Sequence, residues 1–208
     1  MTKLLTTLLI ALSTTLFAQV EVAKDVLDKL SATTKAYTNM TIGFDFIFEN
    51  KSQSINEQQS GVLVLEGDNF RLEMNEQTII NDGESQWVYL KDINEVQIME
   101  HDPEDDMMSP NKLFTIYEQG YKYTYGGAKA EEGKRLHIID LFPEESGAFI
   151  KVQLLINAAK NQLHKIILFD KNSGTYTYLV TSFKSNTDVR PFTFNTGDYP
   201  GVEVIDLR

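Results

Sequence analysis

The chain has 208 residues, no Cys and a formal net charge of −11. Without Cys it can form neither disulfides nor a lipid anchor on a cysteine thiol. The negative charge repels nucleic acids and anionic membrane surfaces, which argues against both as partners. The length suits one domain with a substantial hydrophobic core.

The first predicted element is a secretory signal peptide over residues 1–18. Lys3 precedes a long apolar run, and Ala18 is the small residue expected at a cleavage site. The apolar run is shorter than the roughly 20 residues that a membrane-spanning helix needs. Cleavage would remove Lys3 and change the net charge from −11 to −12. We therefore expect a soluble exported protein, with no lipid anchor and a single domain over residues 19–208; a buried N-terminal helix is the alternative.

The next predicted element is an amphipathic helix over residues 20–37. Its apolar positions recur at helical spacing and share one face: Val22, Val26, Leu27, Leu30 and Thr34. Charged residues occupy the other side, so this helix needs an apolar surface to pack on.

From Thr41 onward the apolar period changes to two, which predicts β-strands. The first strand carries Ile42, Phe44, Phe46 and Phe48 on one face. Turn residues separate the further candidate strands, at 61–66, 70–74, 78–81, 86–91, 95–100, 121–125, 135–141, 148–157, 163–170, 175–183, 192–194 and 203–207.

The strand pattern is interrupted in the middle of the chain by a second predicted helix. Ser109 and Pro110 are typical of a helix cap followed by a first-turn proline. The helix carries a compact apolar cluster of Leu113, Phe114, Ile116 and Tyr117. A meander of about ten or eleven strands with two helices favours a curled antiparallel sheet covered by the helices.

The sequence contains no motif that identifies a catalytic centre or a cofactor site. His137 and His164 lie in strands without metal-ligand neighbours at i+2 or i+4. His101 precedes an acidic run that could bind a divalent cation, but a solvated charged loop explains the run more simply. The segment from Asp170 to Gly174 imitates the start of a calcium loop without its final Glu, so a hairpin turn is the better interpretation. We expect no catalytic residue, no metal and no cofactor.

Apolar side chains on the strands are the most abundant feature of the sequence. Any one of them can serve an ordinary core, but the set as a whole exceeds one face of one sheet. An interior left partly open for an apolar ligand is therefore an alternative, because ligand cavities are mostly apolar. The candidate ligand-binding residues are Phe44, Phe46, Phe48, Leu63, Leu65, Met74, Trp87 and Tyr89.

Four segments in a fixed order carry a resemblance to a known family. They are GVLVLEGDNFRLEM, TIINDGESQWVYL, SPNKLF and PFTFNTGDYPGVEVID. In this order they resemble the periplasmic outer-membrane lipoprotein carrier family, LolA, over essentially the whole mature chain. The sequence departs from the family pattern in lacking the Pro common before Phe70 and in having Leu72 where an aromatic residue is often found.

The resemblance implies a mainly β (α+β) fold, an incomplete antiparallel β-barrel covered by a helical lid. Its apolar cavity would shield the acyl chains of a lipoprotein in the periplasm, between an inner-membrane ABC transporter and an outer-membrane acceptor. Enclosure fits the cargo, because each buried methylene contributes about 0.8 kcal/mol. The family's arginine corresponds to Arg71, which would contact the lid and help control its opening. The lid residues would be Leu113, Phe114, Ile116 and Tyr117.

The leading hypothesis is therefore a monomeric, non-enzymatic carrier of lipoproteins. The same fold serves relatives that carry or sense other lipids or glycolipids, so the fold alone does not define the cargo. A hydrolase built from scattered carboxylates and a plain interaction module are further alternatives. For Arg71, the alternative to a lid contact is a solvent-exposed side chain paired with Glu73 or another acid.

Overall fold

The computed structural model describes residues 2–100, 115–118 and 120–208, with side chains from Gln19 onward. This part of the chain contains one long α-helix, a short 3₁₀ helix and twelve strands. The helices are α1 (Thr2–Lys35) and η1 (Thr196–Asp198), and the strands are β1 (Met40–Asn50), β2 (Ile55–Glu66), β3 (Asn69–Met74), β4 (Gln77–Asn81), β5 (Ser85–Leu90), β6 (Glu95–Glu100), β7 (Tyr121–Glu131), β8 (Lys134–Pro143), β9 (Phe149–Asn157), β10 (Gln162–Asp170), β11 (Gly174–Ser185) and β12 (Glu203–Asp206).

The strands form one mostly antiparallel sheet in the order β12-β6-β5-β4-β3-β2-β1-β11-β10-β9-β8-β7. The sheet is open, and β12 is parallel to β6. The predicted mainly β, incomplete antiparallel architecture is confirmed, with twelve strands in place of ten or eleven. The chain divides into two compact units: unit 1 contains residues 1–35 and 117–175, and unit 2 contains residues 36–116 and 176–208.

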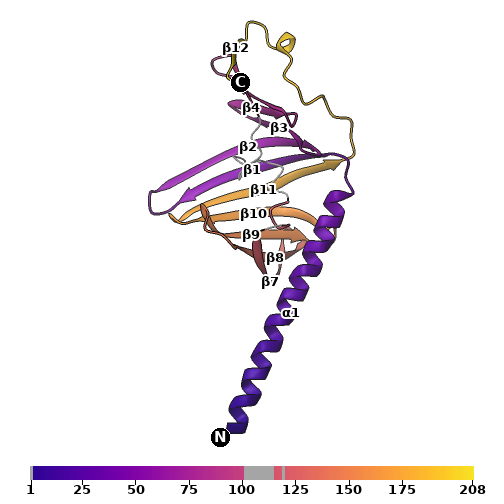
Figure 1. Ribbon diagram of the computed structural model, residues 1–208, viewed down its shortest axis with the longest axis vertical. Helices are drawn as coiled ribbons and strands as arrows, with labels where there is room; N and C mark the ends of the chain where they lie inside the picture. The colour runs from indigo at the N-terminus through magenta and orange to yellow at the C-terminus, as the bar shows by residue number, and fades with distance from the viewer. Residues whose placement is uncertain (1, 101–114, 119) are drawn as a thin grey trace. The chain divides into compact units, whose positions relative to one another are not determined.

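Unit 1 is built from α1 and the strands β7 to β10. The helix packs on β7 and β10 (Figure 1). The predicted amphipathic face is confirmed at Val26, Leu27 and Leu30, all buried, with Ala23 buried beside them in place of the exposed Val22. The helix begins at Thr2, so the predicted signal segment is continuous with it in the structure, and its cleavage stays a prediction. No helix in the described residues combines the length and the apolar character needed to span a membrane.

Strand β7 is longer than its apolar pattern predicts because a glycine pair forms a bulge inside it. The pairing with β8 slips between Tyr125 and Gly127 and then resumes through Glu131. Gly127 has a φ of +100°, a backbone conformation that side chains with a Cβ rarely adopt. The glycine pair, which in the sequence resembles the end of a strand, therefore lets the strand continue with a changed register.

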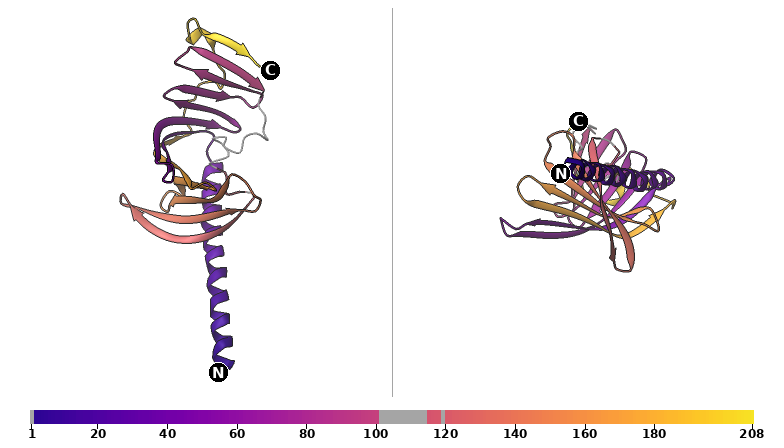
Figure 2. Two further views of the ribbon diagram at one scale, coloured as in Figure 1. Left: turned by 90° about the vertical axis from the view of Figure 1, so that its left-hand side faces the viewer. Right: turned by 90° about the horizontal axis from the view of Figure 1, so that it is seen from below.

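Unit 2 contains β1 to β6, β12 and nearly all of β11. Strands β1, β2 and β11 run side by side in Figure 1, and the short β12, yellow in Figure 2, lies beside β6. Strand β2 begins at Ile55, six residues earlier than predicted. Its first half pairs with β1 but is exposed and polar, so it shows no apolar alternation.

Two of the predicted elements, a strand at 192–194 and the second helix, differ from regular structure in the described residues. The predicted strand at 192–194 is wrong, since these residues lie outside any strand. Their apolar alternation reflects two separate packing contacts: Phe192 is buried, and the Phe194 ring lies 5.5 Å from the Tyr89 ring. In the predicted second helix, Leu113 and Phe114 lie outside the described residues, whereas Ile116 and Tyr117 lie in a turn.

Candidate functional site

Strands β1 to β5 of unit 2 present two faces of different chemistry. The antiparallel register places Ile42, Leu63 and Leu72 next to one another across three strands. On the opposite side of the same strands, Arg71 lies next to Ile80, which lies next to Trp87. We call these the apolar face and the arginine face. The apolar face is defined by Ile42, Phe44, Leu63, Leu65 and Phe70, and the arginine face by Arg71, Ile80, Trp87 and Tyr89.

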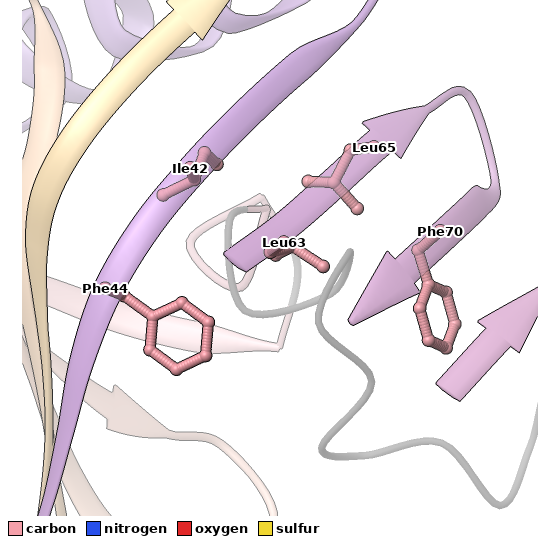
Figure 3. Packing of buried hydrophobic residues seen from close by; sticks show 5 residues of the cluster. All are labelled: Ile42, Phe44, Leu63, Leu65 and Phe70. Carbon is pink, nitrogen blue, oxygen red and sulfur yellow. The ribbon is translucent and has the colours of Figure 1, made fainter. Parts of the chain in front are cut away.

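The centre of the apolar face is a cluster of buried side chains from β1, β2 and β3. Figure 3 shows its five members, Ile42, Phe44, Leu63, Leu65 and Phe70. The Phe44 ring lies over Gly61 of β2, where a Cβ atom would come within 2.7 Å of its Cζ atom. The absence of a side chain at Gly61 therefore leaves the space that the Phe44 ring occupies.

A row of aromatic rings extends the cluster along β1 and β11. Phe46 lies 5.1 Å from Tyr178, and Phe48 lies 4.7 Å from Tyr176, measured between ring centroids. We call Phe44, Phe46, Phe48, Tyr176 and Tyr178 the aromatic row. All its members except Phe44 are half-buried, and burial raises the pKa of the Tyr178 hydroxyl to about 12. The row is thus an apolar surface that remains partly open.

The structure divides the predicted ligand-binding residues between the two faces. Phe44, Phe46, Phe48, Leu63, Leu65 and Met74 share the apolar face, since Phe44 and Met74 both lie next to Gly61. Trp87 and Tyr89 are on the arginine face instead. The eight residues therefore do not line one common surface. Tyr176 and Tyr178 also belong to the apolar face although they were not among the predicted ligand-binding residues, and their alternation along β11 is the signal that could have added them.

The arginine face is covered by the C-terminal segment, defined as residues 186–202. Tyr89 packs against two rings of this segment, with ring centroids 5.5 Å from Phe194 and 4.5 Å from Tyr199. The Tyr89 hydroxyl donates a hydrogen bond of 3.0 Å to Asn94, whose side chain donates in turn to the Pro200 carbonyl. Tyr89 is therefore an anchor for the C-terminal segment.

Arg71 is a second anchor for the same segment. Its side chain is buried, and Nη2 donates to the Pro191 carbonyl oxygen. Glu73, two residues along β3, pairs with Arg190 at 2.8 Å. The alternative of an exposed Arg71 paired with Glu73 is thus wrong. The acceptor for Arg71 lies in the C-terminal segment, and the predicted contact of Arg71 with the lid stays a prediction.

The two predicted lid residues that the structure describes, Ile116 and Tyr117, belong to different units. Tyr117 is buried in unit 1 and lines a cavity of about 320 Å³ with Leu27 and Ser31 of α1. Burial raises the pKa of the Tyr117 hydroxyl to about 12. Ile116 is half-buried in unit 2. With Leu113 and Phe114 outside the described residues, the role of these four side chains as a lid stays a prediction.

The residues considered as metal ligands give no metal site in the part of the chain that the structure describes. No group of three or more His, Asp and Glu side chains is close enough there to bind an ion. Asp170 accepts hydrogen bonds from the backbone N–H groups of Asn172 and Gly174, which is the geometry of a turn and confirms that interpretation. The acidic run after His101 lies outside the described residues.

Comparisons with known proteins place this architecture in a family. A family model described as outer membrane lipoprotein carrier protein LolA matches residues 12–142, more than half of the chain. Solved structures with a similar fold include an uncharacterized conserved protein from Thermus thermophilus, with a TM-score of 0.57 and 12% identity over 89% of this chain and 99% of that one. LprF from Mycobacterium bovis gives a TM-score of 0.54 and 11% identity over 83% of this chain and 98% of that one. No curated protein matches the chain. The family match shows that this chain belongs to the LolA family of outer membrane lipoprotein carrier proteins.

Proposed function

We propose that this protein is a periplasmic carrier that shields the acyl chains of lipoproteins and moves them from the inner to the outer membrane. Membership of the LolA family supports the proposal, because carriers of this family are periplasmic and generally non-enzymatic. The proposal includes removal of residues 1–18 as a signal peptide and action of residues 19–208 as one monomeric domain. Its partners are an inner-membrane ABC transporter that releases lipoproteins and an outer-membrane acceptor.

The observation that carries the proposal is the half-buried aromatic row beside the buried cluster of the apolar face. An acyl chain needs a large apolar surface, because its affinity comes from about 0.8 kcal/mol for each methylene removed from water. Phe46 and Phe48 offer such a surface while keeping part of each ring accessible. We infer that acyl chains lie along this row, with Leu63, Leu65 and Met74 on the same face of the sheet.

The opposite face has a different role in this proposal. Trp87 and Tyr89 lie on the arginine face, where Tyr89 packs against Phe194 and Tyr199 of the C-terminal segment. The acyl-binding surface therefore consists of the residues of the apolar face, without these two aromatic side chains.

A competition experiment with two matched variants tests the proposal. An apolar fluorescent probe is bound to the full mature protein and displaced with a triacylated lipopeptide or with a glycolipid. Phe46→Ser should weaken lipopeptide binding about tenfold, since loss of one aromatic contact of roughly 1–1.5 kcal/mol corresponds to that factor. Ile47→Ser is the control, because Ile47 is also half-buried but points to the other side of β1.

Three outcomes separate the possible functions. Displacement by lipopeptide that is weakened at position 46 and not at position 47 supports a lipoprotein carrier. Displacement by the glycolipid alone, with the same dependence on Phe46, indicates a carrier or sensor of another lipid on the same fold. Equal effects of both variants contradict the proposed surface.

A further inference from the structure

The arginine face of unit 2 contains a cavity of its own, on the opposite side of the sheet from the apolar face. Its volume is about 330 Å³, within the range of small-molecule sites. It lies between strands β3 and β4 and the C-terminal segment, and its lining includes Arg71, Ile80, Arg190, Phe194, Asp198 and Tyr199. Acyl binding on the apolar face would leave this cavity unoccupied.

Arg71 supplies a buried positive charge at this cavity. Only 7% of the Arg71 surface is exposed to solvent. Within the described residues, the guanidinium donates one hydrogen bond, to the Pro191 carbonyl, and forms no ion pair within 4 Å. A guanidinium has five N–H donors, and a buried charge is costly unless it is paired. Burial and the neighbouring charge of Arg190 lower the pKa of the Arg71 guanidinium, which agrees with this unfavourable environment.

The other lining residues define what could occupy the cavity. Arg190 places a second guanidinium at the rim, where its side chain is 71% exposed and pairs with Glu73. The rings of Phe194 and Tyr199 stack at 4.5 Å and form an apolar wall. Asp198 adds one negative charge, which disfavours a ligand that is anionic throughout. These features together suit a small molecule with one anionic group, an apolar portion and a hydrogen-bond donor.

We propose that the cavity binds a small organic phosphate or carboxylate, with the oxyanion on the guanidinium of Arg71 and assisted by Arg190. Arginine suits this role because its planar fork matches two oxygens of a phosphate or a carboxylate. The bound group also bridges β3 and the C-terminal segment, since Arg71 donates to Pro191 and the same cavity is lined by Thr193 and Asn195. Ligand binding is thereby linked to the attachment of this segment to the sheet.

Titration of the full mature protein with inorganic phosphate, and separately with acetate, tests this site. Thermal unfolding and calorimetry are followed at constant ionic strength, with chloride as the reference anion. We expect saturable, millimolar binding of at least one oxyanion and a rise of the unfolding midpoint with its concentration, because a ligand that binds the folded state stabilises it. The anion that binds with the higher affinity identifies the ligand as a phosphate or a carboxylate.

Three variants locate the binding. Arg71→Met should reduce oxyanion affinity at least tenfold, and Arg190→Gln should reduce it severalfold. Arg208→Gln is the control, because Arg208 is also in unit 2 but pairs with Asp206 away from the cavity. If Arg71→Met does not fold, Arg190→Gln and Thr193→Val still report on the site without removing a buried charge.

The proposal is overturned if neither anion stabilises the protein beyond chloride, or if Arg190→Gln and Arg208→Gln have equal effects. Lipopeptide displacement measured with and without phosphate keeps this site distinct from the acyl-binding surface. If the unmodified protein binds lipopeptide but neither oxyanion, the arginine site alone is refuted. If it binds an oxyanion but no lipopeptide, the proposed acyl-binding surface alone is refuted.

Discussion

Replacing Leu63 with Ala measures how strongly the apolar face stabilises unit 2. Leu63 is 2% exposed and belongs to the buried cluster. The change removes three carbon groups, so at about 0.8 kcal/mol each the lost transfer free energy is about 2.4 kcal/mol. The cavity left behind brings the expected loss in free energy of unfolding to about 3–4 kcal/mol. For a chain of this length, that loss lowers the thermal midpoint by roughly 10 °C.

The neighbouring Val62 provides the matched control. It lies on the opposite side of β2 and is 40% exposed. Val62→Ala removes two methyl groups that are little more than half buried, so we expect a loss of about 1 kcal/mol. Urea unfolding of the two variants, monitored by circular dichroism, compares them directly. The dependence of the free energy of unfolding on urea concentration should be the same for both variants. A loss for Leu63→Ala no larger than that for Val62→Ala would show that the two faces are wrongly assigned.

Two further predictions concern polar groups outside the apolar face. Hydrogen bonds from Lys129 and Lys165 hold the pKa of Glu131 down from 4.5 to about 2, so its stabilising contribution is present above pH 4.5 and disappears as the pH falls through 2. Because these pairs are partly exposed, Glu131→Gln should cost about 1 kcal/mol in urea unfolding at pH 6 and almost nothing at pH 2; a constant difference would refute the linkage. Asn39 is buried and its side chain both donates to and accepts from the backbone of Thr187. Asn39→Ala should therefore cost about 2 kcal/mol, against less than about 0.5 kcal/mol for the exposed Asn56→Ala, and equal costs would show that this contact is not stabilising.

The strands were predictable from the sequence wherever one side of the strand is buried. In β1 the alternation of Ile42 and Phe44 with smaller or polar residues follows directly from the burial of one face. The first half of β2 shows no such alternation, because both of its sides are largely exposed and its pairing with β1 depends on backbone hydrogen bonds. The second half of β7 was missed because Gly126 and Gly127 resemble a strand end, whereas they form a bulge.

The division of the site between two faces was not predictable from alternation alone. Alternation shows which residues share a face within one strand, but the match between strands depends on the hydrogen-bond register. In the structure, Ile80 rather than Ile79 lies next to Trp87, and this places Trp87 on the same face as Arg71. The bond from Arg71 to Pro191 joins residues 120 positions apart, a separation at which no local pattern indicates contact.

Site-specific photocrosslinking in the cells that produce the protein tests the central claim most directly. A photoreactive amino acid replaces Phe46 in one variant and Ile47 in the other, and the irradiated protein is purified and its adducts are analysed by mass spectrometry. A carrier that holds acyl chains along the aromatic row predicts adducts with triacylated lipoprotein at position 46 and far fewer at position 47. Adducts with free glycolipid at position 46, or lipoprotein adducts in equal amounts at both positions, would contradict the account.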